Sequence, residues 1–559
     1  MEPYTRQRFF RDLIAGTTVG IVAIPLAMAL AIASGVAPQH GLYTAMIAGF
    51  VIALTGGSRY SVSGPTAAFV VILYPVTQQF GLAGLLVASL LAGFILIGMA
   101  LARLGRLIEY VPEPVTLGFT SGIAIVIAAL QLKDFFGLSL ENLPVGRVEK
   151  FTVIAQSFIH LDWATALVGI LTLAVLIGWS RLKLPLPGHL PAVLLGALAA
   201  WLLAQAGHPV ETIGSRFTYM LPDGSSGHGI PAVLPHFLWP WQQPGPDGMP
   251  LDWSLATLRA LLPAAFSIAM LGAIESLLCA VVLDNMTGTR HHANSELLGQ
   301  GIGNLVVPFF GGITATAAIA RSAVNYRAGA QSPVASMIHA LFVMAGLLAL
   351  APALSYLPMA SLAALLLLVA WNMSEAHKVA GLVRKAPWGD VLVLLACLSL
   401  TVLFDMVVAI TTGIVLASLL FMRDVSEMTR VSDISSSRQQ GLSGQLDEVP
   451  PGWTVFKIRG PLFFAAADRV FSELAAQIAD KTGVILYMDA VPILDAGGLS
   501  ALGKFIDVCA RRQVRLIVAD LQFQPLKTLA RAQLRPVEGQ LAFTSTLREA
   551  IALSHAGPA

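Results

Sequence analysis

Long apolar segments alternate with short polar connections over the first three quarters of the chain. An α-helix needs ~20 apolar residues to cross a bilayer, and half-helices need fewer. On this measure the pattern predicts about fourteen membrane segments, at 12–34, 41–55, 65–79, 82–103, 113–132, 163–181, 189–206, 258–284, 295–309, 316–328, 333–352, 357–372, 388–405 and 407–422. The third and the tenth are too short to cross alone, so we expect them to be half-helices.

Two similar interruptions lie far apart in this pattern. Residues 56–68 read GGSRYSVSGPTAA, and residues 311–321 read GGITATAAIAR. Each begins with a Gly-Gly pair and passes through small and hydroxyl residues into a new apolar helix. Interrupted helices at matching places in two halves of a membrane protein indicate a transporter's binding site. Their N-terminal N–H groups and dipoles favour an anion there.

The polar pattern changes after Met422. We expect a membrane domain at 1–425, a polar linker at 426–450 and a small soluble domain at 451–559. Strand patterns alternate with helical patterns in the last part, which predicts an α/β fold with a mainly parallel sheet. The predicted strands are 453–459, 484–488 and 516–519, and the predicted helices are 466–479, 497–511, 523–533 and 545–554.

Composition supports a membrane protein and excludes several other classes. Hydrophobic residues make up 56% of the chain and charged residues 12%, against about 25% charged residues in a soluble domain. The net charge of +2 does not suggest nucleic acid. We expect no enzyme activity and no cofactor, because the chain has no nucleophile–base motif and no phosphate-binding glycine loop. We also expect no metal site, since His291-His292 lacks a third ligand at a useful spacing.

Basic residues gather at one set of segment ends. These residues are Arg6, Arg8, Arg11, Arg103, Arg106, Arg181, Lys183, Arg290, Arg384, Lys385 and Arg423. The longest opposite loop, 207–257, contains only Arg216 as a basic residue. By the positive-inside rule, these placements predict a multi-pass membrane protein with both termini in the cytoplasm.

Small and hydroxyl residues at the two half-helix starts are candidate anion ligands. Side-chain hydroxyls could come from Thr66, Thr314 and Thr316, although Thr at a helix start is commonly a cap. Backbone N–H groups could come from Ala67, Ala68, Ala317 and Ala318, because the first N–H groups of a helix have no intrahelical partner.

Two charged residues in apolar segments are the remaining candidates. A charge such as Glu275 in mid-span costs at least ~2.5 kcal/mol on insertion scales. Glu275 could be a proton carrier that is neutralised as substrate binds, or a protonated structural acid bonded to a neighbouring helix. Arg321, one turn into the tenth segment, could hold the anion or pair with a carboxylate such as Glu275.

Several motifs resemble those of the SulP anion transporters, also called solute carrier family 26. They are PLAMALA at 25–31, GLY at 41–43, SGPTAA at 63–68, NSEL at 294–297, GQG at 299–301 and IARSAVN at 319–325. The C-terminal domain is similar to the STAS domain of that family. Within the family, residues 271–284 resemble most the aerobic C4-dicarboxylate transporters.

The resemblance implies a fold, a mechanism and partners. The fold is a polytopic α-helical membrane protein with a seven-plus-seven inverted repeat, divided into core and gate domains, plus a cytoplasmic α/β STAS domain. The mechanism is elevator-like alternating access, with Leu26 and Leu30 near the anion. The partners are protons, the small anion, the lipid bilayer, a second copy in a homodimer and acyl carrier protein at the STAS domain.

The chain also departs from the family pattern. Many relatives have Gln at the position of Leu26, which puts the usual anion contacts in doubt. Sodium-coupled relatives have Asp and Thr where this chain has Glu275 and Cys279, so a sodium site is not expected. In the STAS domain, Asp495 is followed by Ala496 where antagonist relatives have a phosphorylatable Ser.

These observations predict a secondary active transporter of small anions. The expected substrate is a C4-dicarboxylate such as succinate, fumarate, malate or aspartate, taken up with protons. Sulfate or bicarbonate transport, an anion channel, and a STAS-based regulatory protein are the alternatives. Glu275 discriminates against a channel, which needs no titratable carrier.

Overall fold

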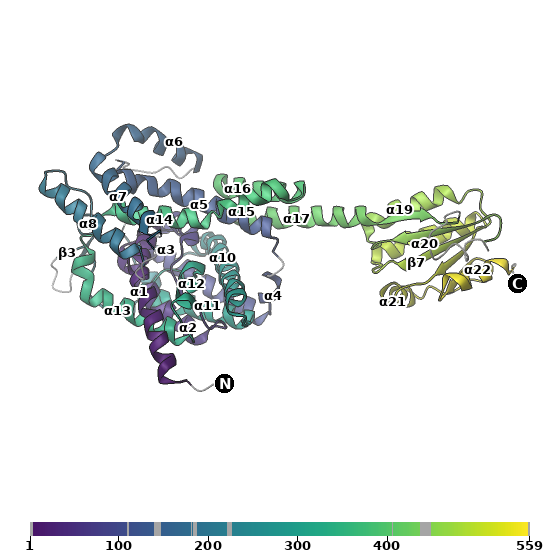
Figure 1. Cartoon of the computed structure of the whole chain (residues 1–559), viewed down its shortest axis with the longest axis horizontal. Coiled ribbons are helices and arrows are strands. Elements are labelled where there is room, and N and C mark those ends of the chain that lie inside the picture. Colours follow the sequence, from purple (N-terminus) through teal and green to yellow (C-terminus); the bar gives the residue numbers. More distant parts are fainter. Residues whose placement is uncertain are drawn as a thin grey trace. The chain divides into compact units, whose positions relative to one another are not determined.

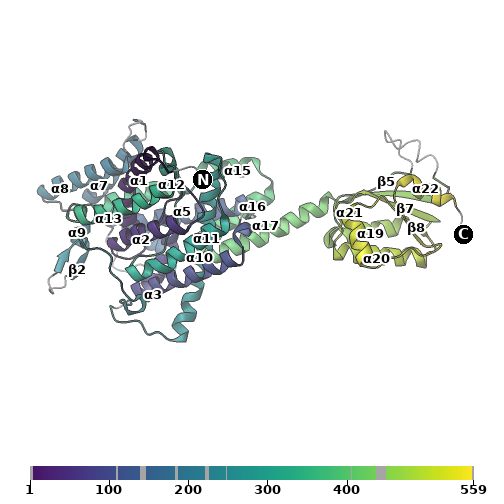
Figure 2. The ribbon, with the colours of Figure 1, turned by 90° about the horizontal axis from the view of Figure 1, so that it is seen from below.

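The computed structural model describes residues 4–108, 111–138, 147–179, 181–182, 187–220, 226–246, 248–404, 406–435 and 449–556. The chain forms two compact units, Met1–Ile414 and Val415–Ala559 (Figures 1 and 2). The first is built almost entirely of helices, and the second is built around a five-stranded sheet.

Most helices of the first unit follow the predicted apolar segments. The helices are α1 (Arg6–Ala33), α2 (Pro38–Thr55), α3 (Ala67–Leu101), α4 (Gly105–Ile108), α5 (Glu113–Phe136), α6 (Arg147–Ser157), α7 (Trp163–Trp179), α8 (His189–Gln205), α9 (Ile213–Arg216), α10 (Leu255–Thr287), α11 (Ala293–Val306), α12 (Ile319–Arg327), α13 (Val334–Leu354), α14 (Met359–Met373), α15 (Ala376–Lys385) and α16 (Trp388–Leu403). Of these, α4, α6, α9 and α15 lie outside the predicted segments. Short 3-10 turns are η1 (Phe158–His160), η2 (Pro240–Gln242) and η3 (Val307–Phe310).

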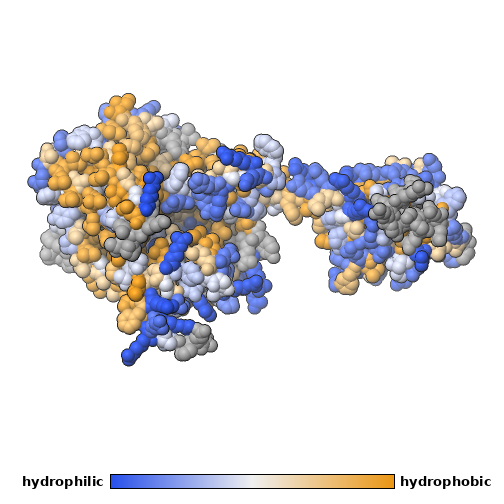
Figure 3. All heavy atoms as spheres, viewed as in Figure 1, coloured by the Kyte–Doolittle hydropathy of each residue, from blue (hydrophilic) through white to orange (hydrophobic). Residues whose placement is uncertain are grey.

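Many helices of the first unit have the length and composition of membrane spans. Within the described residues, seven helices are long and apolar enough to cross a membrane, and eight if α7 and the helix bent by 111° before it form one span. Two shorter apolar helices, α8 and α16, accompany them. Hydrophobic residues also cover broad areas of the visible surface of this unit (Figure 3). An apolar surface of this kind suits contact with lipid chains.

Helix α3 joins two predicted segments, 65–79 and 82–103, into one element with a break. Gly81 has φ +66° and ψ −165°, which only glycine adopts readily, and it interrupts the helical backbone. The carbonyl of Pro244 accepts the N–H of Ala83 (3.2 Å) next to the break. A Cβ atom at Gly81 would lie 2.2 Å from the carbonyl carbon of Gly245. The loop before α10 therefore fits closely against the break only because Gly81 has no side chain.

The helices of the first unit pack in three groups. Helix α3 packs against α10 and α11, α1 packs against α2, α12 and α13, and α5 packs against α14 and α16. The short strands β1 (Ser63–Gly64) and β4 (Thr316–Ala317) pair, and so do β2 (Thr218–Met220) and β3 (Ser226–His228). The first pair lies within the interruptions themselves.

The second unit is an α/β domain. Its sheet has the order β5 (Arg430–Asp433), β6 (Trp453–Arg459), β7 (Gly483–Ala490), β8 (Arg515–Ala519) and β9 (Leu541–Thr544). All neighbouring strands are parallel except the antiparallel pair β5 and β6. The helices are α19 (Phe464–Gln477), α20 (Ala496–Arg511), α21 (Phe523–Arg531) and α22 (Leu547–His555), and α17 (Met406–Met428) crosses the boundary between the units.

Alternating strand residues bury both faces of this sheet. Phe456 and Leu486 lie in one hydrophobic cluster with Phe505 of α20, whereas Val455 lies in another cluster with Ile551 of α22. Side chains of successive strand residues point to opposite faces. The parallel sheet predicted from the sequence is therefore confirmed, with helices covering each face.

The sequence analysis missed the two edge strands. Residues 430–433 were assigned to the linker at 426–450, yet they form β5, and Ile434 after them is 1% exposed. Strand β9 was not predicted at all. Both strands have four residues, and those of β5 are mostly exposed, so neither carries a strong strand pattern. Pairing with β6 and β8 decides their structure.

The buried thiol of Cys509 in α20 generates a prediction about the second unit. Burial raises the pKa of this thiol from 9.0 to about 12. Because the folded-state pKa lies above the unfolded one, the associated stability is present below pH 9 and is lost as the pH rises towards 12. In a chain carrying Cys279→Ala and Cys397→Ala, we expect Cys509 to react with a thiol reagent at least ~100-fold more slowly in the folded protein than in denaturant.

The control is the triple variant that also carries Cys509→Ala. It should lose less stability between pH 9 and 12 in chemical denaturation. Rapid labelling of folded Cys509 at neutral pH would contradict the burial of this thiol.

Candidate anion-binding site

The two interruptions meet in the first unit. Strands β1 and β4 pair antiparallel, with Ser63 opposite Ala317 and Gly64 opposite Thr316. Helix α3 begins directly after β1, and helix α12 begins directly after β4. The starts of both helices therefore lie beside one short β-ladder, as their matching sequences predict.

Neither helix start is capped by a side chain. Thr66 is the N-cap of α3 and Ala318 is the N-cap of α12, and both have extended backbone without a side-chain capping bond. Ala67 and Ala68 form the first turn of α3 and are buried. Their N–H groups therefore remain candidates for an anion.

At the start of α12 the structure differs from the prediction that the N–H group of Ala318 is available to bind an anion. Its N–H group donates to the carbonyl of Val62 (3.1 Å) and continues the ladder between the two interruptions. Ala317 lies opposite Ser63, between hydrogen-bonded positions, so its N–H points away from β1. The prediction for Ala318 was wrong because residues 316–318 are extended and α12 begins only at Ile319.

The hydroxyls of Thr314 and Thr316 form hydrogen bonds within the protein. The hydroxyl of Thr314 shares a hydrogen bond with Ser89 of α3 (2.6 Å). The hydroxyl of Thr316 contacts Ser276 (2.8 Å) and lies 3.1 Å from the carbonyl oxygen of Gly272. These contacts attach the second interruption to α3 and α10, which favours the structural interpretation for Thr314 and Thr316.

Glu275 of α10 faces the start of α3. The hydroxyl of Thr66 donates to its Oε2 atom (2.9 Å), and the residue keeps part of its surface exposed. No nitrogen of Arg321 forms an ion pair with this carboxylate within 4.0 Å among the described residues. The alternative of a direct Arg321–Glu275 pair is therefore not what the structure shows.

Arg321 is buried where the two interruptions pair through β1 and β4. It is 3% exposed, and its Nη2 atom donates to the carbonyl of Pro65 (2.7 Å). Its Nε and Nη1 atoms have no hydrogen-bonding partner among the described residues. A Cβ atom at Gly64 would lie 2.7 Å from Nη1. Because Gly64 has no side chain, the guanidinium can lie against the backbone of β1. Its Nε and Nη1 atoms remain available as hydrogen-bond donors.

The two leucines predicted near the anion lie on α1. This helix packs against α2, α12 and α13. Leu30 is 2% exposed within the main hydrophobic cluster, whereas Leu26 keeps some exposed surface. Leu30 is therefore enclosed by the hydrophobic core, whereas Leu26 is not.

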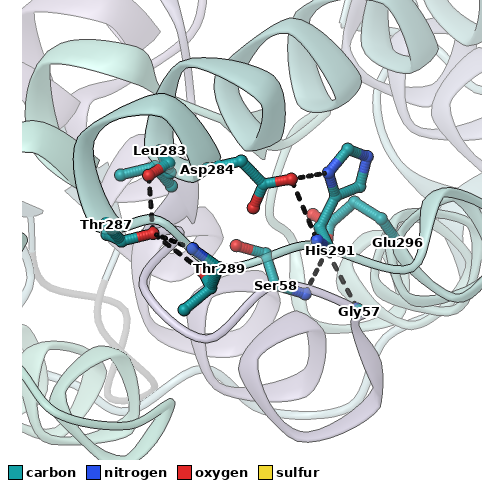
Figure 4. Close-up of polar contacts among 8 residues, drawn as sticks. All are labelled: Gly57, Ser58, Leu283, Asp284, Thr287, Thr289, His291 and Glu296. Atoms are coloured by element: carbon teal, nitrogen blue, oxygen red, sulfur yellow. Dashed lines mark hydrogen bonds and ion pairs between the residues drawn. The ribbon is translucent and has the colours of Figure 1, made fainter.

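Side chains from the second half of the unit bind the backbone of residues 57–65, here called the crossover segment. Figure 4 shows Oε2 of Glu296, which accepts the N–H groups of Gly57 and Ser58 (both 3.0 Å). Asn325 donates to the carbonyl of Tyr60 (3.0 Å), and Ser336 donates to that of Ser61 (2.6 Å). Through these contacts Glu296 holds the backbone at the start of the crossover segment.

The same arrangement continues towards β1. The N–H of Val62 donates to the hydroxyl of Ser322 (2.9 Å), and Gln300 donates to the hydroxyl of Ser63 (3.1 Å). Asn304 binds both the N–H and the carbonyl of Ala315 (2.8 Å each) in the second interruption. Sequence reasoning did not assign these roles, although Gln300, Ser322 and Asn325 lie in the quoted motifs.

Two histidines of the first unit are further polar residues to consider. His291 is bound through Nδ1 to Asp284 (2.8 Å). His339 of α13 is fully buried, and neither ring nitrogen has a hydrogen-bonding partner among the described residues. His339 is the one histidine in the apolar segment 333–352, which is the signal that could have identified it.

Models of known protein families and several known proteins match most of this chain. The model of the sulfate permease family matches residues 9–397, and that of the STAS domain matches residues 446–550. The chain is 40% identical over 530 residues to the "Putative sulfate transporter YvdB" of Bacillus subtilis (strain 168), covering 94% of both chains. It is 27% identical to the bicarbonate transporter BicA of a Picosynechococcus strain, covering 94% of this chain and 90% of BicA.

Solved structures show the same fold. The transmembrane domain of a cyanobacterial bicarbonate transporter BicA is 26% identical, with a TM-score of 0.60 over 74% of this chain and 98% of that chain. The murine solute carrier 26 family member A9 anion transporter, in the inward-facing state, has a TM-score of 0.82 at 17% identity and covers 100% and 93% of the two chains. The expected transmembrane fold with a C-terminal STAS domain is thereby confirmed.

The comparisons do not support the finer resemblance to C4-dicarboxylate transporters, because the similar proteins named above are described as sulfate, bicarbonate or anion transporters. The comparisons do establish the broader assignment to a family of anion transporters. With its family match over residues 9–397 and its C-terminal STAS domain, this chain belongs to the sulfate permease family of membrane anion transporters.

Proposed function

We propose that this protein is a secondary active transporter that takes up a small oxyanion together with protons. The observation that carries the proposal is the Arg321 guanidinium, which is buried at the crossing of β1 and β4 with two nitrogen atoms unpartnered. A buried charge without a full set of partners is costly. An anion bound there would supply the missing acceptors.

The helix starts support the same position for the anion. The first turn of α3 begins beside Arg321, and neither α3 nor α12 has a side-chain cap. N-terminal N–H groups and helix dipoles stabilise negative charge. We place the anion against Ala67, Ala68 and Arg321, with Leu26 of α1 nearby.

Glu275 is the proposed proton carrier. Its carboxylate binds Thr66, the N-cap of α3, and so lies directly beside the first turn where we place the anion. A negative carboxylate there would repel the substrate, whereas a protonated one would not. Binding of the anion and of a proton would therefore favour each other. An anion channel has no need of this coupling.

Sulfate is the first substrate to test, because the relative that is 40% identical is described as a sulfate transporter. Bicarbonate is the second, since BicA proteins are similar over most of the chain. The C4-dicarboxylate prediction rests on the resemblance of residues 271–284 alone. Competition among these three anions in one uptake assay would decide between them.

The remaining expectations concern location and partners. We propose a bacterial inner-membrane protein with both termini and the STAS domain in the cytoplasm, working as a homodimer by an elevator-like movement. The implied partner, acyl carrier protein, would need a basic surface on the STAS domain. The candidates for it are Lys504, Arg511, Arg512 and Arg515. The three arginines donate to carbonyl oxygens of that domain, which leaves their positive charge in place, whereas Lys504 pairs with Asp468 (3.4 Å).

The proton-carrier role predicts a specific change in Glu275→Gln. The amide can still accept from Thr66, so the fold is preserved, but it cannot take up a proton. Binding of sulfate should persist, while proton-driven accumulation in proteoliposomes should fall at least ~10-fold and become independent of pH, as expected for loss of a positioned proton-transfer group. Counterflow at equal pH on both sides should fall less than accumulation.

The matched control is Glu113→Gln, which alters an exposed carboxylate in the first turn of α5. It should transport normally. If Glu275→Gln still accumulates sulfate with normal pH dependence, Glu275 is not the carrier.

The anion site predicts a loss of affinity in Arg321→Gln. A hydrogen bond to a charged group contributes about 1.5–3 kcal/mol, so removing the guanidinium should weaken binding by about 10- to 100-fold. Arg321→Lys should recover part of it, because the charge remains but the forked donors do not. Arg327→Gln, at the exposed end of α12, is the control. Unchanged sulfate affinity in Arg321→Gln, with a folded protein, would refute the site.

A further inference from the structure

A second polar pocket lies at the end of α10, away from the candidate anion site. It has a volume of about 860 Å³ and contains none of the residues assigned above to anion or proton binding. Helix α4, the last turn of α10, the turn after it and the start of α11 form its walls. The lining residues are Arg106, Val281, Asp284, Asn285, Gly288, Thr289, Arg290, His291, His292, Ala293, Asn294 and Ser295.

The pocket is rich in hydrogen-bond donors. Arg106 comes from α4 and Arg290 from the turn after α10, and no hydrogen bond or ion pair joins either guanidinium to a described residue. His292, Asn294 and the hydroxyl of Ser295 lie along the same wall. Two arginines without carboxylate partners at one pocket favour an anionic ligand.

The one carboxylate in the lining is already engaged. Asp284 accepts both the backbone N–H (3.0 Å) and the ring Nδ1 of His291 (2.8 Å), as Figure 4 shows. The His291 side chain is 7% exposed, and its Nε2 has no partner among the described residues. Asp284 thus orients a buried imidazole within the pocket wall, and its single negative charge offsets only one of the two arginines.

The nearby Glu296 is engaged as well. Its oxygens bind Gly57, Ser58 and Gln300, so it points away from the pocket and into the crossover segment. Glu296 does not line the pocket, so no oxygen of its side chain competes there for the arginine donors. The excess of positive charge and the number of donors in the lining favour a ligand with several acceptor oxygens.

We propose that this pocket binds a phosphate group, held by Arg106 and Arg290, as a second anion site separate from the transport site. Arginine suits this ligand because its planar fork can donate two parallel bonds to phosphate oxygens. The phosphate could belong to a free ion or to a phospholipid headgroup, since both present the same oxygens.

A ligand in this pocket would be linked through helices α10 and α11 to the residues proposed for transport. Helix α10 carries Glu275 and ends at the pocket. The turn that follows leads into α11, whose Glu296 holds Gly57 and Ser58 of the crossover segment. A ligand that joins Arg106 to Arg290 would fix the α10–α11 connection against α4.

The test compares the wild-type chain, the double variant Arg106→Gln/Arg290→Gln and the control Arg103→Gln. Arg103 is exposed in the same connection but does not line the pocket. Binding of inorganic phosphate to the full chain in detergent is measured by thermal shift. Retention of phosphatidylglycerol against phosphatidylcholine is measured by native mass spectrometry of the full chain.

We expect the double variant to bind at least one of the two probes ~10-fold or more weakly than the wild type, as loss of charge-assisted contacts requires. The control should match the wild type. Loss of phosphate binding identifies a soluble ligand, and loss of phosphatidylglycerol retention identifies a lipid headgroup. Equal binding of both probes by all three chains, or no binding of either by the wild type, overturns the proposal. The single variants Arg106→Gln and Arg290→Gln replace the double variant if it does not remain monodisperse.

Discussion

The helical unit depends on how the crossover segment satisfies its backbone hydrogen bonds. Residues 57–65 are not helical, yet they lie inside a membrane-type fold where unpaired N–H and carbonyl groups cost several kcal/mol each. Glu296, Asn325, Ser336 and Ser322 each bind a backbone group of this segment. Because these side chains come from α11, α12 and α13, the first interruption can form only when the second half of the unit is in place.

The same constraint creates the candidate site. Arg321 uses one nitrogen to bind the carbonyl of Pro65 and keeps two without partners. Gly64 permits this approach, because a side chain there would meet the guanidinium. The uncapped start of α3 and the carboxylate of Glu275 lie next to it. Backbone support and the proposed anion site therefore depend on the same few residues.

The end of α10 connects this arrangement to a second cluster of charges. Asp284 and His291 stiffen the turn into α11, and Glu296 one turn later holds the crossover segment. The pocket of Arg106 and Arg290 is thus connected to β1 through the turn into α11, Glu296 and residues 57–62 of the crossover segment. This connection is the element through which a ligand in the proposed second site would act on the proposed transport site.

The sequence by itself determined the membrane class, the paired interruptions and the parallel sheet of the second domain, because these depend on hydropathy, glycine placement and strand periodicity along the chain. It also identified Glu275 and Arg321 as costly charges in apolar segments. Only the tertiary structure decided that Ala318 donates to Val62, that the hydroxyls of Thr314 and Thr316 bind Ser89 and Ser276, and that residues 430–433 form a strand. Each of these depends on a partner distant in sequence, and local patterns carry no information about which distant group a hydrogen bond will reach.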